Sequence, residues 1–210
     1  MVNFYTHHRR KAFRVGLAVI AGTKSPVGPD GMTQIISASA DDSFIEVAFP
    51  FAFFAGNVSR TSAFVGSNNY ITFGAGRTEY NSLSLASNPS QSSIHLGSAD
   101  NSYQRVFRFN DPSNRFTRIR YEGTAGTSGT SGSPNILWEV TLFNPSLSSG
   151  TQYVEVVFGV HNRTSGLFGV GGSGITPLSG GTIQANQSYV FSSGSTGVTW
   201  TIESGKFITL

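Results

Sequence analysis

Five arginines alternate with aromatic residues in one stretch of the sequence, and this arrangement could bind a polyanion. They are Arg105, Arg108, Arg115, Arg118 and Arg120, interleaved with Tyr103, Phe107, Phe109, Phe116 and Tyr121. Stacked rings and guanidinium groups hold the bases of single-stranded RNA in many proteins. In an extended strand, however, Arg118 and Arg120 project on the face opposite to Ile119. The pattern therefore favours an arginine-rich outer face over an apolar inner one, with the arginines paired to Asp111, Glu122 or a partner subunit.

No residues have the spacing of a common catalytic or metal site. The sequence contains no G-x-S-x-G, no H-E-x-x-H, no P-loop and no G-x-G-x-x-G following a strand. His95 and His161 occur singly, and neither Asp41-Asp42 nor Asp100-Asn101 belongs to a D-x-D-x-D calcium loop. The 11 scattered acidic residues nominate no facing pair of carboxylates. We therefore predict that the protein is not an enzyme and holds no cofactor or metal.

Aromatic side chains offer a second kind of site, a platform on which a sugar ring could stack. Tyr70, Tyr80, Trp138 and Trp200 are candidates by residue type alone. An aromatic ring combines a large apolar face with, in Tyr and Trp, a polar group at its edge. A module that binds a cell-surface glycan or another host receptor is therefore an alternative that the sequence leaves open.

The basic charge of the chain is concentrated near its N-terminus. The 210 residues include 14 Lys and Arg against 11 Asp and Glu, for a formal net charge of +3. Five of the basic residues precede the first acidic one, Asp30; they are Arg9, Arg10, Lys11, Arg14 and Lys24. The rest of the chain is therefore slightly acidic, whereas a nucleic-acid binder needs a basic face on its folded domain. We expect no nucleic-acid partner, and we expect Arg9, Arg10, Lys11 and Arg14 to attach the chain to a more acidic neighbour.

The composition excludes several other classes of protein. The absence of Cys excludes disulfide-stapled domains and cysteine zinc sites. A hydrophobic content of 38% excludes disorder driven by charge, and no apolar run approaches the roughly 20 residues of a membrane-spanning helix. Residues 15–21 follow a basic segment as in a signal peptide, but the apolar run is at the short limit. We expect no cleaved signal peptide and predict a short strand at 15–21 instead.

Short runs of β-branched and aromatic residues recur along the chain, separated by Gly, Ser, Asn and Pro. Apolar residues alternate with polar ones where the pattern is clearest: Ile136, Trp138, Val140 and Leu142 share one face, and Val154, Val156, Phe158 and Val160 share another. We predict strands at 44–48, 63–65, 70–73, 93–96, 103–109, 116–121, 136–143, 153–160, 188–191, 198–202 and 207–210. No segment has the periodicity of a helix. The predicted fold is an all-β, antiparallel, jelly-roll-like sandwich with an extended N-terminal arm.

Composition divides the chain into three segments. Residues 1–36 form the basic arm and attachment segment, and residues 37–170 form the core of the sandwich. Residues 171–210 are expected to complete this sandwich or to exchange with a neighbouring subunit. Residues 110–114 predict a hairpin loop, and the Gly-rich stretches 123–134 and 169–181 predict longer loops.

Several blocks of the sequence resemble one known type of module. They are DDSFIEVAFPF (41–51), FFAG (53–56), FVGSNNYITFG (64–74), YNSLSLASNP (80–89), SADNSYQRV (98–106), IRYEGT (119–124) and SPNILWE (133–139). In this order they resemble a β-sandwich module of marine tailed-phage virion and fibre-like proteins, which is also found in bacterial surface proteins. The resemblance covers residues 41–165. Asn69 stands where the pattern usually has Gly, and Asn tolerates the left-handed conformation that the turn needs.

The resemblance implies a structural protein of a phage particle, and it supplies no catalytic residues. A head- or tail-attached decoration or fibre-type protein, assembled in the host cytoplasm, is the leading expectation. Its partners are expected to be other virion proteins and copies of itself in a symmetric homo-oligomer. A bacterial surface adhesion domain is a further alternative.

Overall fold

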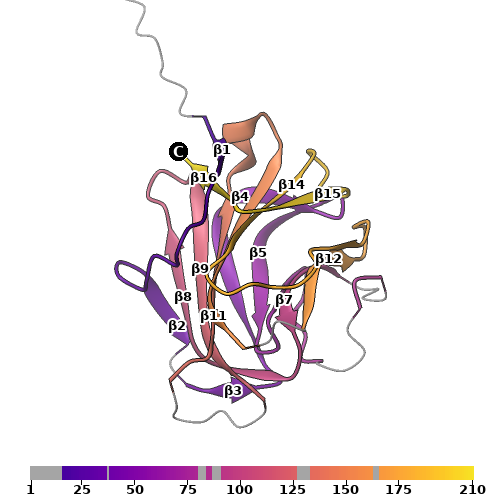
Figure 1. The fold of residues 1–210 in the computed structure, drawn as a ribbon. Coiled ribbons are helices and arrows are strands. Elements are labelled where there is room, and N and C mark those ends of the chain that lie inside the picture. Colours follow the sequence, from indigo (N-terminus) through magenta and orange to yellow (C-terminus); the bar gives the residue numbers. More distant parts are fainter. Residues whose placement is uncertain (1–15, 37, 80–83, 87–90, 127–132, 163–165) are drawn as a thin grey trace, which may run out of the picture.

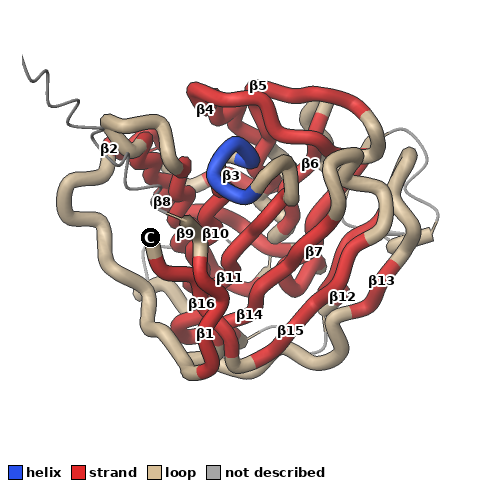
Figure 2. The backbone as a smooth tube through the Cα atoms, turned by 90° about the horizontal axis from the view of Figure 1, so that it is seen from above, coloured by secondary structure: helices blue, strands red, loops and turns tan. Residues whose placement is uncertain are grey.

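The computed structural model describes residues 16–36, 38–79, 84–86, 91–126, 133–162 and 166–210. The predicted arm residues Arg9, Arg10, Lys11 and Arg14, and Tyr80 among the aromatic candidates, lie outside these ranges. The described residues contain many strands, no α-helix, and a single 3₁₀ turn, η1 (Pro145–Ser148). Two antiparallel sheets face each other across one apolar core, which confirms the predicted all-β sandwich (Figures 1 and 2).

The larger sheet has the strand order β15-β14-β11-β10-β9-β8-β2, with β3 also paired to β8. Its strands are β2 (Thr33–Ile36), β3 (Ala40–Asp41), β8 (Asn101–Asn110), β9 (Phe116–Ala125), β10 (Ile136–Phe143), β11 (Gln152–His161), β14 (Ser188–Ser193) and β15 (Trp200–Ser204). Strands β8 to β11 follow one another as a meander. Neighbours in the sheet therefore follow sequence order more closely than in a jelly roll built from two Greek keys.

The smaller sheet has the order β13-β12-β7-β6-β5-β4. Its strands are β4 (Phe44–Ala55), β5 (Val58–Gly66), β6 (Tyr70–Phe73), β7 (Ser92–Ser98), β12 (Leu167–Gly172) and β13 (Leu178–Ser179). A separate two-stranded ribbon joins β1 (Ala18–Ala21) to β16 (Lys206–Thr209), near the two ends of the described chain (Figure 1). Of the C-terminal strands, β14 pairs with β11 and β15 with β14, so both extend the larger sheet of the same chain.

The core forms because alternate side chains of both sheets point inward. Ile136, Trp138, Val140 and Leu142 are fully buried, as their alternation predicted. The ring of Trp138 stacks on that of Tyr121 with centroids 4.8 Å apart, and the Tyr121 hydroxyl donates to the Ser67 carbonyl at 2.6 Å. Buried rings that also satisfy their polar atoms fix a single packing arrangement.

One residue predicted for the core lies outside it. Val160 is 52% exposed, although it continues the alternation of Val154, Val156 and Phe158. The register between β10 and β11 shifts here, because Trp138 is opposite Phe158 whereas Ile136 is opposite His161. This irregularity adds one residue to β11, so His161 turns inward and Val160 turns outward.

The stretch 169–181 is also not a continuous loop, because its first four residues belong to β12. Gly169 and Gly171 pair with β7. A Cβ atom at Gly171 would lie 2.1 Å from the Leu85 carbonyl oxygen. Glycine is therefore required in this strand by the close approach of another part of the backbone, rather than by flexibility.

Asn69 adopts the left-handed conformation that its position in the sequence predicted, with φ of 58°. Its side-chain oxygen accepts a hydrogen bond from the Trp138 indole at 3.3 Å. We expect Asn69→Gly to cost about 1 kcal/mol of unfolding free energy, because it removes this bond but leaves the left-handed backbone unstrained. Asn69→Ala should cost about 2 kcal/mol, because it adds left-handed strain. Urea unfolding of both variants measures the difference, and equal losses would contradict the conformational argument.

Candidate functional site

The segment 16–36, which we call the strap, lies across the outer face of the larger sheet (Figure 1). It begins in β1, paired to β16, and ends in β2, paired to β8. Three glutamates on adjacent strands lie on this outer face: Glu122 on β9, Glu139 on β10 and Glu155 on β11. Their residues are 4%, 2% and 1% exposed. Carboxylates this deeply buried need strong partners, and the strap provides several of them.

Glu155 connects the strap and β16 to the larger sheet. One of its carboxylate oxygens accepts from the Lys24 ammonium at 2.9 Å. The other accepts from the backbone N–H of Ile208, in β16, at 2.8 Å. Because β1 pairs with β16, this single side chain holds the strap directly through Lys24 and the β1–β16 ribbon through Ile208.

Glu139 holds the middle of the strap. Its carboxylate accepts from the backbone N–H groups of Val27 at 2.8 Å and Gly28 at 3.2 Å, and from the Arg120 guanidinium at 2.9 Å. Hydrogen bonds in which one group is charged are about twice as strong as neutral ones. The strap, residues 16–36 of the predicted arm, is therefore an integral part of the sandwich.

The five predicted arginines do not form one patch. Arg105 and Arg120 pair with Glu122 at 2.5 and 2.8 Å on the outer face. Arg118 lies on the same face, over the ring of Phe116 and within 3.3 Å of the Thr141 hydroxyl. Arg105 and Arg120 are therefore paired with buried glutamates of the larger sheet, and Arg118 lies on the same outer face.

The other two arginines lie elsewhere. Arg115 pairs with Asp111 inside the 110–114 hairpin, at 2.6 Å. Its hydrogen bonds hold the pKa of the Asp111 carboxyl down at about 2. Arg108 is opposite Ile119 in the ladder, and Ile119 belongs to the inner, core-facing row. Arg108 therefore has the inward orientation, at an edge of the sheet where β8 meets β2.

Three of the four aromatic side chains that were candidates for sugar binding are buried. Tyr70, Trp138 and Trp200 are 1%, 0% and 5% exposed. Trp138 stacks on Tyr121, and Trp200 stacks on Phe53 with centroids 6.2 Å apart. Tyr70 and Trp138 therefore have no exposed ring face for a ligand, whereas Trp200 lines the cleft described next.

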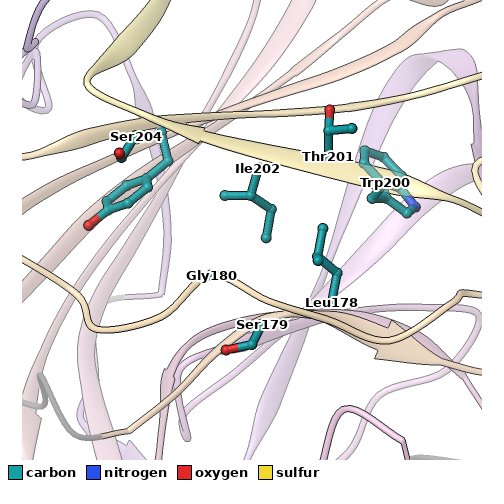
Figure 3. Close-up of a pocket in the computed structure, with 8 residues that line it drawn as sticks. Leu178, Ser179, Gly180, Trp200, Thr201, Ile202 and Ser204 are labelled. Carbon is teal, nitrogen blue, oxygen red and sulfur yellow. The ribbon is translucent and has the colours of Figure 1, made fainter.

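A cleft of about 290 Å³ opens between the edges of the two sheets (Figure 3). Ile202 from β15 and Leu178 from β13 approach each other across it. Trp200 and Tyr189 also line it. The remaining lining is contributed by Ser179, Gly180, Thr201 and Ser204, so the lining residues carry no charge. The lining of this cleft thus combines two aliphatic side chains, Leu178 and Ile202, with two aromatic ones.

Two histidines are buried in the sheets. His95 lies between the Ser93 hydroxyl at 3.0 Å and the Ser98 hydroxyl at 2.8 Å, and burial lowers its pKa to about 4. His161 hydrogen-bonds the Leu96 carbonyl at 3.0 Å, and burial lowers its pKa to about 4 as well. Both imidazoles are enclosed, so their role is in stability.

The acidic pairs of the sequence act in turns. Asp41 accepts from the Asp42 backbone N–H at 2.9 Å, and Asp42 accepts from the Asn68 amide at 3.0 Å. In the described ranges no group of three or more His, Cys, Asp or Glu residues is suited to a metal ion. Among the same residues, no helix is long and apolar enough to cross a membrane.

The comparisons with known proteins do not identify the chain. No protein-family model matches the sequence, and no curated protein or solved structure matches it.

Proposed function

We propose that this chain is a non-enzymatic structural protein of a tailed-phage particle. It is a decoration or fibre-type sandwich, attached to the head or tail through residues 1–15. The resemblance of residues 41–165 to virion and fibre-like modules supports the phage context. The observation that carries the proposal is the fastening of the strap: the segment directly after the basic arm is fixed to the core sheet by Glu139 and Glu155.

This fastening matters because an anchor has to transmit force. Tension applied at residues 1–15 passes into β1 and the strap. From there it passes through two buried carboxylates into β10 and β11, at the centre of the larger sheet. If residues 16–36 made no contact with the sandwich, tension at residues 1–15 would reach the sandwich only at residue 37 and would not pass into the centre of the larger sheet. The four basic residues of the arm then supply electrostatic attraction to an acidic neighbour.

Deletion of residues 1–15 tests the proposal. In phage particles assembled from the genome that encodes this chain, we expect the shortened protein to fold normally but to be depleted at least tenfold, measured by quantitative mass spectrometry of purified particles. Circular dichroism and urea unfolding of the purified protein provide the folding control.

A matched variant separates charge from length. Replacing Arg9, Arg10, Lys11 and Arg14 by Gln keeps the arm and removes its charge, and it should also deplete the protein from particles. Normal incorporation of the deletion variant would contradict the proposal. Deletion of 1–36 is not an equivalent test, because it also removes the partners of Glu139 and Glu155.

A further inference from the structure

We propose that the free edge of β15 binds residues 1–15 of a second copy of this chain as an added antiparallel or parallel strand. The inference rests on the proposed anchoring role of the arm and names the surface that receives it. β15 is an edge strand of the larger sheet, and β13 is an edge strand of the smaller one. The two edges lie on the same side of the sandwich, with the cleft between them (Figures 2 and 3).

The backbone of β15 has hydrogen-bonding groups to offer. The Gly205 N–H donates to the Ser188 carbonyl at 2.9 Å, at the end of the β14–β15 ladder. In an antiparallel ladder alternate residues bond to the partner strand, so Glu203 and Thr201 bond to β14. Ile202 and Ser204 then direct their N–H and C=O groups away from β14, toward the open edge.

The edge of β15 also lacks most of the features that usually block pairing. Proteins protect their edge strands with Pro, Lys, bulges or very short strands. The smaller sheet has two edge strands that are protected in this way. β4 contains Pro50, and β13, at the opposite edge, has only two residues. The ladder of β2 with β8 has a register shift. By contrast, β15 contains no Pro or Lys, and its ladder with β14 runs without a shift.

The lining of the cleft indicates what kind of segment fits. An added strand places every second side chain over the cleft, whose lining includes the aliphatic side chains of Leu178 and Ile202. Residues Val2, Phe4 and Thr6 have this alternation, in a segment of 15 residues that can extend for about 50 Å. The cleft lining has no charge that an apolar side chain would have to desolvate.

Of the two segments of a second copy that could pair with the β15 edge, charge favours the arm over its β15 strand. Glu203 is the one charged residue of β15, and it is exposed. Two β15 strands paired with each other would bring two such carboxylates close together. The arm carries Arg9, Arg10, Lys11 and Arg14 directly after its apolar residues, so it brings opposite charge to the same edge.

The direction of β1 indicates that the arm bound at this edge comes from an adjacent copy rather than from the same chain. Ala21 of β1 is opposite Lys206, which follows β15 through Gly205, whereas Ala18 is opposite Thr209. The chain therefore enters β1 at the end of the ribbon that is farther from β15. An arm would have to reverse its direction to reach the edge of its own sandwich, whereas the edge of an adjacent copy requires no reversal.

Amide hydrogen exchange tests the pairing directly. A synthetic peptide of residues 1–15 is added to the chain that lacks residues 1–15. The amides of Ile202 and Ser204 should then exchange at least tenfold more slowly. Thr201 and Glu203 serve as internal controls, because their amides already bond to β14 and should change little. A peptide with Val2→Asn and Phe4→Asn keeps the basic residues and should not protect the edge.

Sedimentation of the full chain tests the second copy. The full chain should form oligomers that the deletion of 1–15 converts to monomers. Absence of protection at Ile202 and Ser204, or equal protection by the substituted peptide, would overturn the inference. A monomeric full chain with protected edge amides would assign the edge to its own arm and would also overturn it. Incorporation into particles tests the anchoring role separately. If incorporation requires residues 1–15 but the β15 amides are not protected, the edge pairing is wrong and the proposed function still holds.

Discussion

The substitution Glu139→Ala is expected to lower the free energy of unfolding by about 4 kcal/mol. It removes the acceptor of the Val27 and Gly28 N–H groups, and it leaves the buried Arg120 with Glu122 alone. Removal of one partner from a buried ion pair typically costs about 3–5 kcal/mol, because the remaining groups stay desolvated. Urea unfolding followed by tryptophan fluorescence measures the change.

A surface ion pair provides the matched control. Arg77 and Glu79 are 2.9 Å apart, but the Glu79 side chain is 53% exposed. The substitution Glu79→Ala should cost less than about 1 kcal/mol. If Glu139→Ala cost no more than Glu79→Ala, the strap would not be fastened as its contacts indicate.

Acidification is expected to destabilise the fold between about pH 6.5 and pH 4. The unfolded chain binds protons at its histidines near pH 6.5, whereas His95 and His161 in the native state have pKa values of about 4. Burial is the main cause for both, and for His95 the positive charge of Arg77 adds to it. The native state therefore binds fewer protons in this range, and stability is lost as the pH falls. The loss should reach roughly 2–3 kcal/mol for each histidine by pH 4.5.

Urea unfolding at a series of pH values measures this dependence. The variants His95→Gln and His161→Gln remove the titrating groups one at a time. Each should be less stable at pH 7, but each should flatten the decrease between pH 6.5 and pH 4.5, and the double variant should nearly abolish it. A slope unchanged in the double variant would assign the acid sensitivity to other groups.

The strands were predictable because the outer and inner faces of this sandwich differ in composition. The alternation of Ile136, Trp138, Val140 and Leu142 placed β10 correctly on the core. Val160 was misplaced because a register shift in β11 depends on the pairing with β10, and a strand read alone does not reveal its partner. The same limit applies to Gly169 and Gly171, because the Leu178 backbone approaches Gly169 and the Leu85 backbone approaches Gly171.

The fastening of the strap was not predicted, although its residues were visible in the sequence. Glu139 and Glu155 interrupt strongly apolar strands, and alternation placed them on the outer face, where solvent exposure is the usual expectation. Their burial results from contacts to Lys24, Val27 and Gly28, more than 100 residues away in the chain. Sequence separation of this size hides such partners from local reasoning. The signal that was present is a carboxylate repeated at the centre of adjacent hydrophobic strands.

Hydrogen exchange of the full chain tests the central claim, that residues 16–36 belong to the sandwich and transmit the pull of the arm to it. The amides of Val27, Gly28 and Ile208 donate to Glu139 and Glu155. They should exchange nearly as slowly as the ladder amides of β10 and β11, and the protection of Val27 and Gly28 should disappear in Glu139→Ala. Exchange of Val27 and Gly28 at the rate of an unfolded chain, while β10 and β11 remain protected, would contradict the account.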